Sequence, residues 1–172
     1  DGSAVLGLGN VGASAALPVM EGKAMLFKAL ADVNAFPLCL DTQDTEEIIK
    51  IVKAIAPNFA GINLEDISAP RCYEIEKRLQ EELDIPVMHD DQHATAIIIL
   101  AGLINANKVI GKDILKAKVV LAGAGPAGYA TAKLLKDYGV SNVVVCDSKG
   151  VITSNRGNLD PHKQEISTDL YS

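Results

Sequence analysis

Apolar and polar segments alternate along the chain in a way that predicts strands and helices in turn. Short apolar runs are predicted to be strands at residues 4–8, 36–40, 59–64, 85–89, 118–122 and 142–146. A segment with helical spacing of its apolar residues lies between each successive pair of runs. This alternation predicts an α/β fold of βαβ units, with a parallel sheet covered by helices on both faces.

The first long helical segment, residues 13–30, contains two residues that interrupt helices. Pro18 lacks a backbone N–H and Gly22 is a weak helix former, so we expect two short helices instead of one. Lys23 would begin the second helix, beside an apolar segment. If Lys23 is buried, its pKa falls and it becomes a general base; the alternative is a surface lysine with its ammonium in water.

The later helices differ in how much of their surface is apolar. Ser68 can cap a helix that runs to about Leu83. This helix is expected to turn Cys72, Ile75 and Leu79 inward and to expose the charged residues Glu74, Glu76, Lys77, Arg78, Glu81 and Glu82. The helix at 92–108 is apolar nearly all round, which predicts a buried helix. After Gly150 the composition turns polar and no regular element is predicted.

Two pairs of carboxylates, Glu65-Asp66 and Asp90-Asp91, directly follow two of the predicted strands. The carboxyl ends of parallel strands meet at one edge of a sheet, where ligands bind. Mg²⁺ and Mn²⁺ prefer carboxylate oxygens, so the four side chains predict a divalent-metal site. In the alternative reading, one acid of each pair caps the following helix.

Histidines flank the second acidic pair, at positions 89 and 93. Zinc proteases carry two histidines at this spacing on one helix, with a glutamate between them. Here the glutamate is missing, and no single predicted helix holds both histidines. We therefore expect His89 and His93 to form hydrogen bonds in the turn and not to bind zinc.

A glycine motif, Gly123-Ala-Gly-Pro-Ala-Gly128, lies between a predicted strand and a predicted helix. Gly123 permits a tight turn, Gly125 lets the backbone approach a pyrophosphate, and Gly128 allows close packing of helix on strand. Asp147 follows 19 residues later, at the end of the next strand, where a carboxylate binds ribose hydroxyls. The motif predicts a dinucleotide site that includes the loop residues Gly123, Gly125, Pro126, Ala127 and Gly128.

Asp147 also bears on the choice between NAD and NADP. A carboxylate repels the 2′-phosphate of NADP and accepts a hydrogen bond from the free 2′-hydroxyl of NAD. Ser148 and Lys149 follow immediately and could contact a phosphate. NAD is favoured and NADP stays open.

A similar glycine pattern, Gly7-Leu-Gly-Asn-Val-Gly12, occurs near the start of the chain. No carboxylate follows it at the spacing of a dinucleotide site. A nest of backbone N–H groups that holds a substrate carboxylate is an equally physical use of this loop.

Charge and cysteine content narrow the classes of partner. With a net charge of −6 and a pI of about 5.0, the 172-residue chain offers no basic surface to a nucleic acid. Its most apolar run, 94–104, is too short to span a bilayer. Three separated cysteines, an odd number, are typical of reduced thiols in a cytoplasmic protein. The chain opens at Asp1 without a methionine, as expected of a processed, trimmed or partial sequence.

Four ordered motifs resemble the small malic enzymes of bacteria and archaea. They are the segments Asp1–Asn10, Pro18–Ala24, Gly61–Arg71 and His89–His93. The resemblance implies a metal- and nicotinamide-dependent conversion of malate to pyruvate and CO₂. It also implies metal ligands at Glu65, Asp66 and Asp91, with Asp90 as a neighbouring acidic group, and a general base at Lys23.

The same resemblance suggests how the chain is divided. Residues 1–90 would be part of a substrate and metal domain, and residues 91–172 the start of a Rossmann cofactor domain. The family's catalytic tyrosine would lie before residue 1, so we expect a central fragment that is inactive alone. The expected partners are malate or pyruvate, NAD or NADP, Mg²⁺ or Mn²⁺, and further copies of the chain in a homodimer or larger homo-oligomer.

Two other functions fit the same motifs. In malolactic chemistry the cofactor is retained and lactate leaves. In the other reading, the chain is a non-catalytic fragment that binds metal or nucleotide. Ala94, where the family usually has glycine after His93, and Ala4, where larger malic enzymes have an arginine, are departures from the family pattern.

Overall fold

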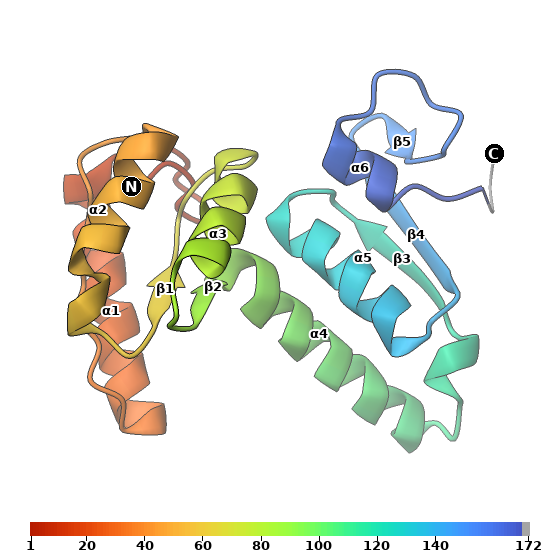
Figure 1. Ribbon diagram of the computed structural model, residues 1–172. Coiled ribbons are helices and arrows are strands. Elements are labelled where there is room, and N and C mark those ends of the chain that lie inside the picture. The colour runs from red at the N-terminus through yellow and green to blue at the C-terminus, as the bar shows by residue number, and fades with distance from the viewer. Residues whose placement is uncertain (170–172) are drawn as a thin grey trace. The chain divides into compact units, whose positions relative to one another are not determined.

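The structure is a computed structural model that describes residues 1–169. It divides into two compact units, Asp1–His89 and the described chain from Asp90 onward. Parallel strand pairs separated by helices occur in both units (Figure 1), which confirms the α/β class. The assignment of residues 1–90 to substrate and metal, and of 91–172 to the cofactor, stays a prediction.

The first unit is built around a two-stranded parallel sheet. Its elements in chain order are α1 (Ala13–Ala31), α2 (Thr45–Ile55), the 3₁₀ turn η1 (Ala56–Asn58), β1 (Ile62–Leu64), α3 (Arg71–Glu82) and β2 (Val87–His89). In the register of β1 on β2, Ile62 lies opposite Val87 and Leu64 opposite His89. Helices α2 and α3 lie against each other and bury the core residues Ile48, Ile49, Val52, Cys72, Ile75 and Leu79.

Two predictions about the start of the chain are wrong. Residues 4–8 form a turn closed by a bridge between Val5 and Gly9, not a strand. Helix α1 runs without a break through Pro18 and Gly22. A proline removes only one backbone hydrogen bond, and the many good helix formers around it in α1 keep the helix intact.

The strand predicted at 36–40 is also absent, because this segment forms no ladder with another part of the described chain. The pattern of apolar residues fits a strand, but a strand needs a partner for its backbone groups. Phe36 instead contacts Phe59, with 6.2 Å between the ring centroids. Helix α2 is capped by Asp44, whose carboxylate accepts a 2.8 Å hydrogen bond from the backbone N–H of Glu47.

Helix α3 differs from its prediction in two ways. Pro70 is the residue before its first turn, and no side chain caps it, so the cap predicted at Ser68 is wrong. Glu76, expected on the solvated face, is only 5% exposed. Its carboxylate accepts a 2.7 Å hydrogen bond from the backbone N–H of His89, at the edge of β2 that faces away from β1. The buried position therefore reflects a bond to a strand that sequence periodicity does not reveal.

The second unit contains the three-stranded sheet. Its elements are α4 (Asp90–Val109), η2 (Ile114–Lys116), β3 (Lys118–Ala122), α5 (Pro126–Tyr138), β4 (Asn142–Asp147), β5 (Gly150–Val151) and α6 (Pro161–Glu165). Strands β3 and β4 are parallel, and β5 runs antiparallel to β4. Helix α5 lies along this sheet and packs on α4 (Figure 1). The core contains the fully buried residues Leu135, Val145, Ile152 and Ile166.

Helix α4 is not the buried helix that its composition predicts. Ile98 is 72% and Val109 86% exposed, because α5 covers only part of its surface within this unit. The segment after Gly150 has more structure than expected, in β5 and α6. Among the described residues no helix combines the length and the apolar character that crossing a membrane requires.

Candidate functional site

The second glycine motif forms the turn between β3 and α5. Gly123 has a φ of 137°, a conformation that residues with side chains rarely adopt. A methyl group built on Gly128 would lie 2.0 Å from the carbonyl oxygen of Gly123, so only glycine lets the helix approach the turn this closely. Helix α5 begins at Pro126, directly after Gly125. The backbone N–H groups at this helix end are available to an anion.

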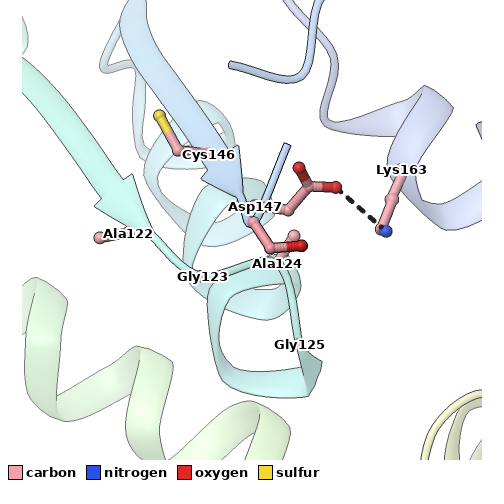
Figure 2. Close-up of a pocket in the computed structure, with 8 residues that line it drawn as sticks. Ala122, Gly123, Ala124, Gly125, Cys146, Asp147 and Lys163 are labelled. Carbon is pink, nitrogen blue, oxygen red and sulfur yellow. Dashed lines mark hydrogen bonds and ion pairs between the residues drawn. The ribbon is translucent and has the colours of Figure 1, made fainter. Parts of the chain in front are cut away.

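A pocket of about 490 Å³ opens beside this turn (Figure 2). It is lined by Ala122, Gly123, Ala124, Gly125, Cys146, Asp147, Ser148 and Lys163. The structure thus brings together the glycine turn and the end of β4, as the dinucleotide prediction requires. Lys149 and the first residues of α5, Pro126 to Gly128, adjoin these residues in the chain but are not part of the lining.

Asp147 is held by three donors at the end of β4. Its carboxylate accepts hydrogen bonds from Arg156 Nη2 at 2.8 Å, from the backbone N–H of Lys149 at 2.9 Å and from Lys163 Nζ at 3.3 Å. The Arg156 guanidinium, followed by the Lys149 N–H and Lys163, holds the pKa of Asp147 well below its usual value. Asp147 is therefore ionised, and its charge is balanced by two cations.

Arg156 and Lys163 were missed by sequence reasoning, which treated the segment after Gly150 as irregular. Figure 2 shows the Lys163 ammonium turned toward the Asp147 carboxylate, with the lysine on α6. The available signal was the presence of basic residues within 20 positions of Asp147 in an otherwise polar segment. The spacing in the sequence does not distinguish Arg156 and Lys163 from other basic residues nearby.

The first acidic pair follows strand β1. Glu65 is 10% exposed at its side chain, and its Oε1 lies 2.9 Å from Lys23 Nζ on α1. Its other oxygen accepts a 3.2 Å hydrogen bond from the side-chain amide of Asn63. Asp66 is 4% exposed and has a φ of 55°, which is unusual for a residue other than glycine. The candidate base and a candidate metal ligand therefore touch.

The second acidic pair follows strand β2. Leu64 and His89 are register partners at the ends of the two strands, so Glu65 and Asp90 are each the next residue after a paired position. Asp90 and Asp91 form the first turn of α4. The three predicted ligands come from both units: Glu65 and Asp66 from the first, and Asp91 from the second.

Carboxylate oxygens are the donors that Mg²⁺ and Mn²⁺ select, so the chemistry of these residues fits a hard divalent cation. Within residues 1–169, no group of three or more histidine, cysteine, aspartate or glutamate side chains lies close enough together to hold a metal ion. The ligand assignment therefore stays a prediction from strand position and donor type.

The first glycine pattern forms an exposed turn at Gly7 and Gly9, with Leu6 97% exposed. Its last glycine, Gly12, precedes α1 and lies against Gly2, where an added methyl group would be 2.3 Å from the Gly12 carbonyl oxygen. The backbone N–H groups of Val11 and Gly12 both donate to the Gly2 carbonyl. The loop is thus tied to the start of the chain, and its use as a nest for a substrate carboxylate stays a prediction.

Two family models match the chain, one in each half. The malic enzyme N-terminal domain matches residues 1–80, and the malic enzyme NAD-binding domain matches residues 92–170. The chain belongs to the malic enzyme family. This confirms the resemblance inferred from the four sequence motifs.

Individual malic enzymes match nearly the whole chain. It is 64% identical over 167 residues to an NAD-dependent malic enzyme of Geobacillus stearothermophilus, covering 97% of this chain and 35% of that protein. It is 56% identical over 168 residues to a bifunctional malic/malolactic enzyme of Bacillus subtilis, covering 97% of this chain and 41% of that protein. The crystal structure of the NAD-dependent malic enzyme of Thermotoga maritima superposes with a TM-score of 0.92 at 52% identity, covering 98% of this chain and 46% of that chain. The chain thus spans less than half the length of these malic enzymes.

Proposed function

We propose that this chain supplies the metal-binding and cofactor-binding residues of an enzyme that converts malate to pyruvate and CO₂ with reduction of NAD or NADP. The observation that carries the proposal is the 2.9 Å contact between Lys23 Nζ and Glu65 Oε1. The contact lies at the carboxyl end of a parallel strand, where α/β enzymes bind their ligands. A base beside a metal ligand is the arrangement that metal-assisted oxidation of a hydroxyl requires.

Glu65, Asp66 and Asp91 would hold Mg²⁺ or Mn²⁺. The register that places Leu64 opposite His89 supports this assignment, because both acidic pairs then follow the same end of the strand pair. When bound, the cation would polarise the C2 carbonyl oxygen of oxaloacetate, which draws in the electrons of the C–C bond that breaks. Asp90, the sequence neighbour of Asp91, is proposed as a further acidic group of the site.

Lys23 would act as the general base. In its neutral form the amine accepts the proton of the malate C2 hydroxyl while the hydride on C2 leaves for the nicotinamide ring. The Glu65 carboxylate then stabilises the ammonium that forms, because an opposite charge at hydrogen-bond distance favours the protonated lysine. Loss of CO₂ leaves the enolate of pyruvate, and we assign no residue of this chain to its protonation.

The pocket of the second unit would hold the dinucleotide. The glycine turn, with Gly123, Gly125, Pro126, Ala127 and Gly128, would receive the pyrophosphate at the start of α5. Asp147 would accept from ribose hydroxyls. Ser148, Lys149 and Lys163 would contact the 2′-phosphate when the cofactor is NADP. The balanced charge of Asp147 supports acceptance of both cofactors, because Arg156 and Lys163 offset its repulsion of a phosphate.

A chimera tests the proposed activity. The chain would replace the matching 167 residues of the Geobacillus stearothermophilus enzyme. We expect the chimera to form NADH and pyruvate from malate when Mn²⁺ is present, with the unmodified enzyme as the positive control. A folded chimera that binds NAD and Mn²⁺ and yet leaves malate unchanged would contradict the proposal.

Malolactic chemistry is a second candidate, because the Bacillus subtilis relative is named a bifunctional malic/malolactic enzyme. The two reactions differ in their products. Oxidative decarboxylation accumulates NADH and pyruvate, whereas malolactic conversion accumulates lactate and no NADH. Following NADH absorbance and lactate together in the chimera separates them.

The non-catalytic alternative is tested on the chain itself. Isothermal titration with Mn²⁺ and with NAD measures binding without turnover. The proposal predicts that both bind. If both bind and the chimera stays inactive with malate, the chain is a binding module only.

We further propose that the enzyme is cytoplasmic and forms a homodimer or larger homo-oligomer. The three cysteines, Cys39, Cys72 and Cys146, form no disulfide with one another, which suits a reducing compartment. Apolar side chains on and after α1 are exposed, among them Leu30 at 82% and Phe36 at 69%. Analytical ultracentrifugation of the chimera measures the oligomeric state directly.

A further inference from the structure

Asp66 has a backbone conformation that its surroundings must enforce. Its φ of 55° lies in the left-handed region, and its side chain has little access to solvent. Residues other than glycine stay in this region only when neighbouring contacts hold them there, and such residues cluster at functional sites. The contacts that hold Asp66 therefore bear on its use as a ligand.

The segment that holds Asp66 is the start of the chain. The Asp66 carbonyl oxygen accepts from the backbone N–H groups of Ser3 at 3.1 Å and Ala4 at 3.3 Å. Two residues further on, the backbone N–H of Ser68 donates to Ser3 Oγ at 2.9 Å. Residues 66 and 68 are thus both fixed to Ser3, one on each side of Ile67.

Arg71 connects these groups from the first turn of α3. Its Nη1 donates to Asp1 Oδ2 at 2.8 Å, and its Nη2 donates to Ser3 Oγ at 2.8 Å and to Ser68 Oγ at 3.1 Å. Nη1 also donates to the backbone carbonyl of Gln43 at 2.8 Å. One planar guanidinium therefore ties together four residues in three segments of the chain, a task for which a lysine has the wrong geometry.

The Ser3 hydroxyl lies at the centre of this network, and all of its donor and acceptor sites are occupied. Ser3 Oγ donates to Asp1 Oδ1 at 2.6 Å and accepts from both Ser68 and Arg71, which matches the one donor and two acceptor sites of a hydroxyl. The Asp1 side chain is 1% exposed and the Arg71 side chain 22%. A charge pair buried this far is tolerated only when its partners are all in place.

Apolar side chains attach α3 to the core of the first unit. Cys72, Ile75 and Leu79 anchor that helix and are all fully buried. Arg78, on the same helix, differs from Arg71 because its ion-pair partners Glu46, Glu74 and Glu82 are on the surface. Arg71 instead directs its hydrogen bonds to the segments that carry or support Asp66.

We infer that Arg71 is a positioning residue that holds the Glu65-Asp66 loop in the conformation that binds a divalent cation. The inference rests on the proposed function, which makes Glu65 and Asp66 metal ligands. Gly2 lies between Asp1 and Ser3, which Arg71 contacts, and its carbonyl oxygen accepts from the backbone N–H groups of Val11 and Gly12. Arg71 thereby couples the metal loop to the first glycine loop.

Mn²⁺ binding to the 172-residue chain tests the inference, measured by electron paramagnetic resonance titration. Arg71→Gln removes the guanidinium and its positive charge. Arg71→Lys keeps a positive charge beside Asp1 but loses the two guanidinium nitrogens that donate side by side. Groups that orient metal ligands typically contribute about 10- to 100-fold in affinity. We expect Arg71→Gln to raise the Mn²⁺ dissociation constant by about that factor and Arg71→Lys by somewhat less. Arg78→Gln, the matched control on the same helix, should leave it unchanged.

An Asp66→Asn variant separates positioning from general destabilisation. If Arg71 positions the metal ligands of this loop, Arg71→Gln has a smaller effect on Mn²⁺ affinity once Asp66 is replaced, because only Glu65 of the loop remains to be positioned. Equal fold losses in both backgrounds would overturn the inference. Parental Mn²⁺ affinity in Arg71→Gln would overturn the inference as well. If circular dichroism shows that Arg71→Gln does not fold, parental affinity in Arg71→Lys would do the same.

Failure of the proposed function has a different signature. If Asp66→Asn binds Mn²⁺ as tightly as the parent, or the parent binds none, the ligand assignment fails and the inference falls with it. If Asp66→Asn weakens binding and the Arg71 variants do not, only the inference fails.

Discussion

The side-chain nitrogen of Lys23 lies 2.9 Å from Oε1 of Glu65. The lysine comes from the middle of α1, and the glutamate directly follows β1, 42 positions later in the chain. Their side chains are 30% and 10% exposed. The contact joins the residue proposed to take a proton with one proposed to hold the metal, and several predictions depend on it.

Replacing Lys23 should remove the base and leave the fold intact. In the chimera, we expect Lys23→Ala to lower kcat for malate oxidation by about 10²- to 10⁴-fold, the range for loss of a general acid or base. The KM for malate should change little, because the amine acts in the proton transfer and not in the binding of malate. Lys28→Ala is the control, since Lys28 lies on the same helix and pairs with the exposed Asp32. Parental turnover in Lys23→Ala would mean that another group is the base.

Replacing Asp91 should weaken metal binding. A ligand contributes at least as much as the groups that orient it, so Asp91→Asn should raise the Mn²⁺ dissociation constant by about 100-fold or more. The measurement is Mn²⁺ titration of the chain by electron paramagnetic resonance. Asp137→Asn, an exposed carboxylate on α5, controls for the loss of one negative charge. Unchanged affinity in Asp91→Asn would remove this residue from the ligand set.

Lys163 should influence the choice of cofactor. It is the one cation among the pocket-lining residues of the described chain, and Lys163→Gln leaves the 2′-phosphate without it. We expect the affinity for NADP to fall about tenfold, the effect of losing one charge-assisted hydrogen bond, while the affinity for NAD changes less. Isothermal titration with both cofactors gives the ratio, with the exposed Lys116→Gln as control. A ratio equal to that of the parent would show that the phosphate binds elsewhere.

Asp147 should make stability depend on pH. The hydrogen bonds from Arg156 and Lys149 lower its pKa in the folded state. A carboxylate of this kind stabilises the fold above its ordinary pKa of about 4, and the contribution is lost as the pH falls through the lower folded value. Asp147→Asn should therefore be less stable than the parent near neutral pH, with a difference that shrinks in acid. Urea unfolding at about pH 7 and about pH 3 tests this. A difference that grows in acid would contradict the sign.

Two glycine substitutions should have opposite effects on stability. Gly128→Ala places a methyl group 2.0 Å from the Gly123 carbonyl oxygen, so it should destabilise the chain by about 1 to 3 kcal/mol or more. In Gly22→Ala the new methyl group meets no atom within 4 Å beyond the nearby backbone of α1, so the change should stabilise the chain by about 0.5 to 1 kcal/mol. The midpoints of thermal unfolding measure both. A stable Gly128→Ala would mean that helix α5 can move away from the turn.

Local signals predicted the second unit better than the first. The bounds of β3 agree with the sequence prediction, and α5 begins at the glycine motif where a helix was predicted, because strand propensity and the glycine turn mark the same positions. The failure at 36–40 has a non-local cause, since an apolar run becomes a strand only where another strand receives its hydrogen bonds. Pro18 and Gly22 lower helix propensity, but in α1 that local cost is outweighed by the rest of the helix.

The candidate site shows the same limit. The acidic pairs and the glycine turn are readable from sequence, because each follows a strand at a fixed offset. Arg71, Glu76 and Lys163 are not, because their partners Asp1, His89 and Asp147 lie 70, 13 and 16 positions away. On an amphipathic helix, Glu76 and Arg71 look like ordinary surface charges. Only the folded chain shows that one bonds to β2 and the other to the loop of Asp66.

Lys23 and the carboxylates at the strand ends are proposed to carry this chain's part of malate oxidation. The most direct measurement is the ratio of NADH to CO₂ released when the chimera turns over malate with Mn²⁺ and NAD. We predict one NADH for each CO₂, with both lost together in Lys23→Ala. Release of CO₂ without NADH, or equal rates of both products in Lys23→Ala and the parent chimera, would contradict it.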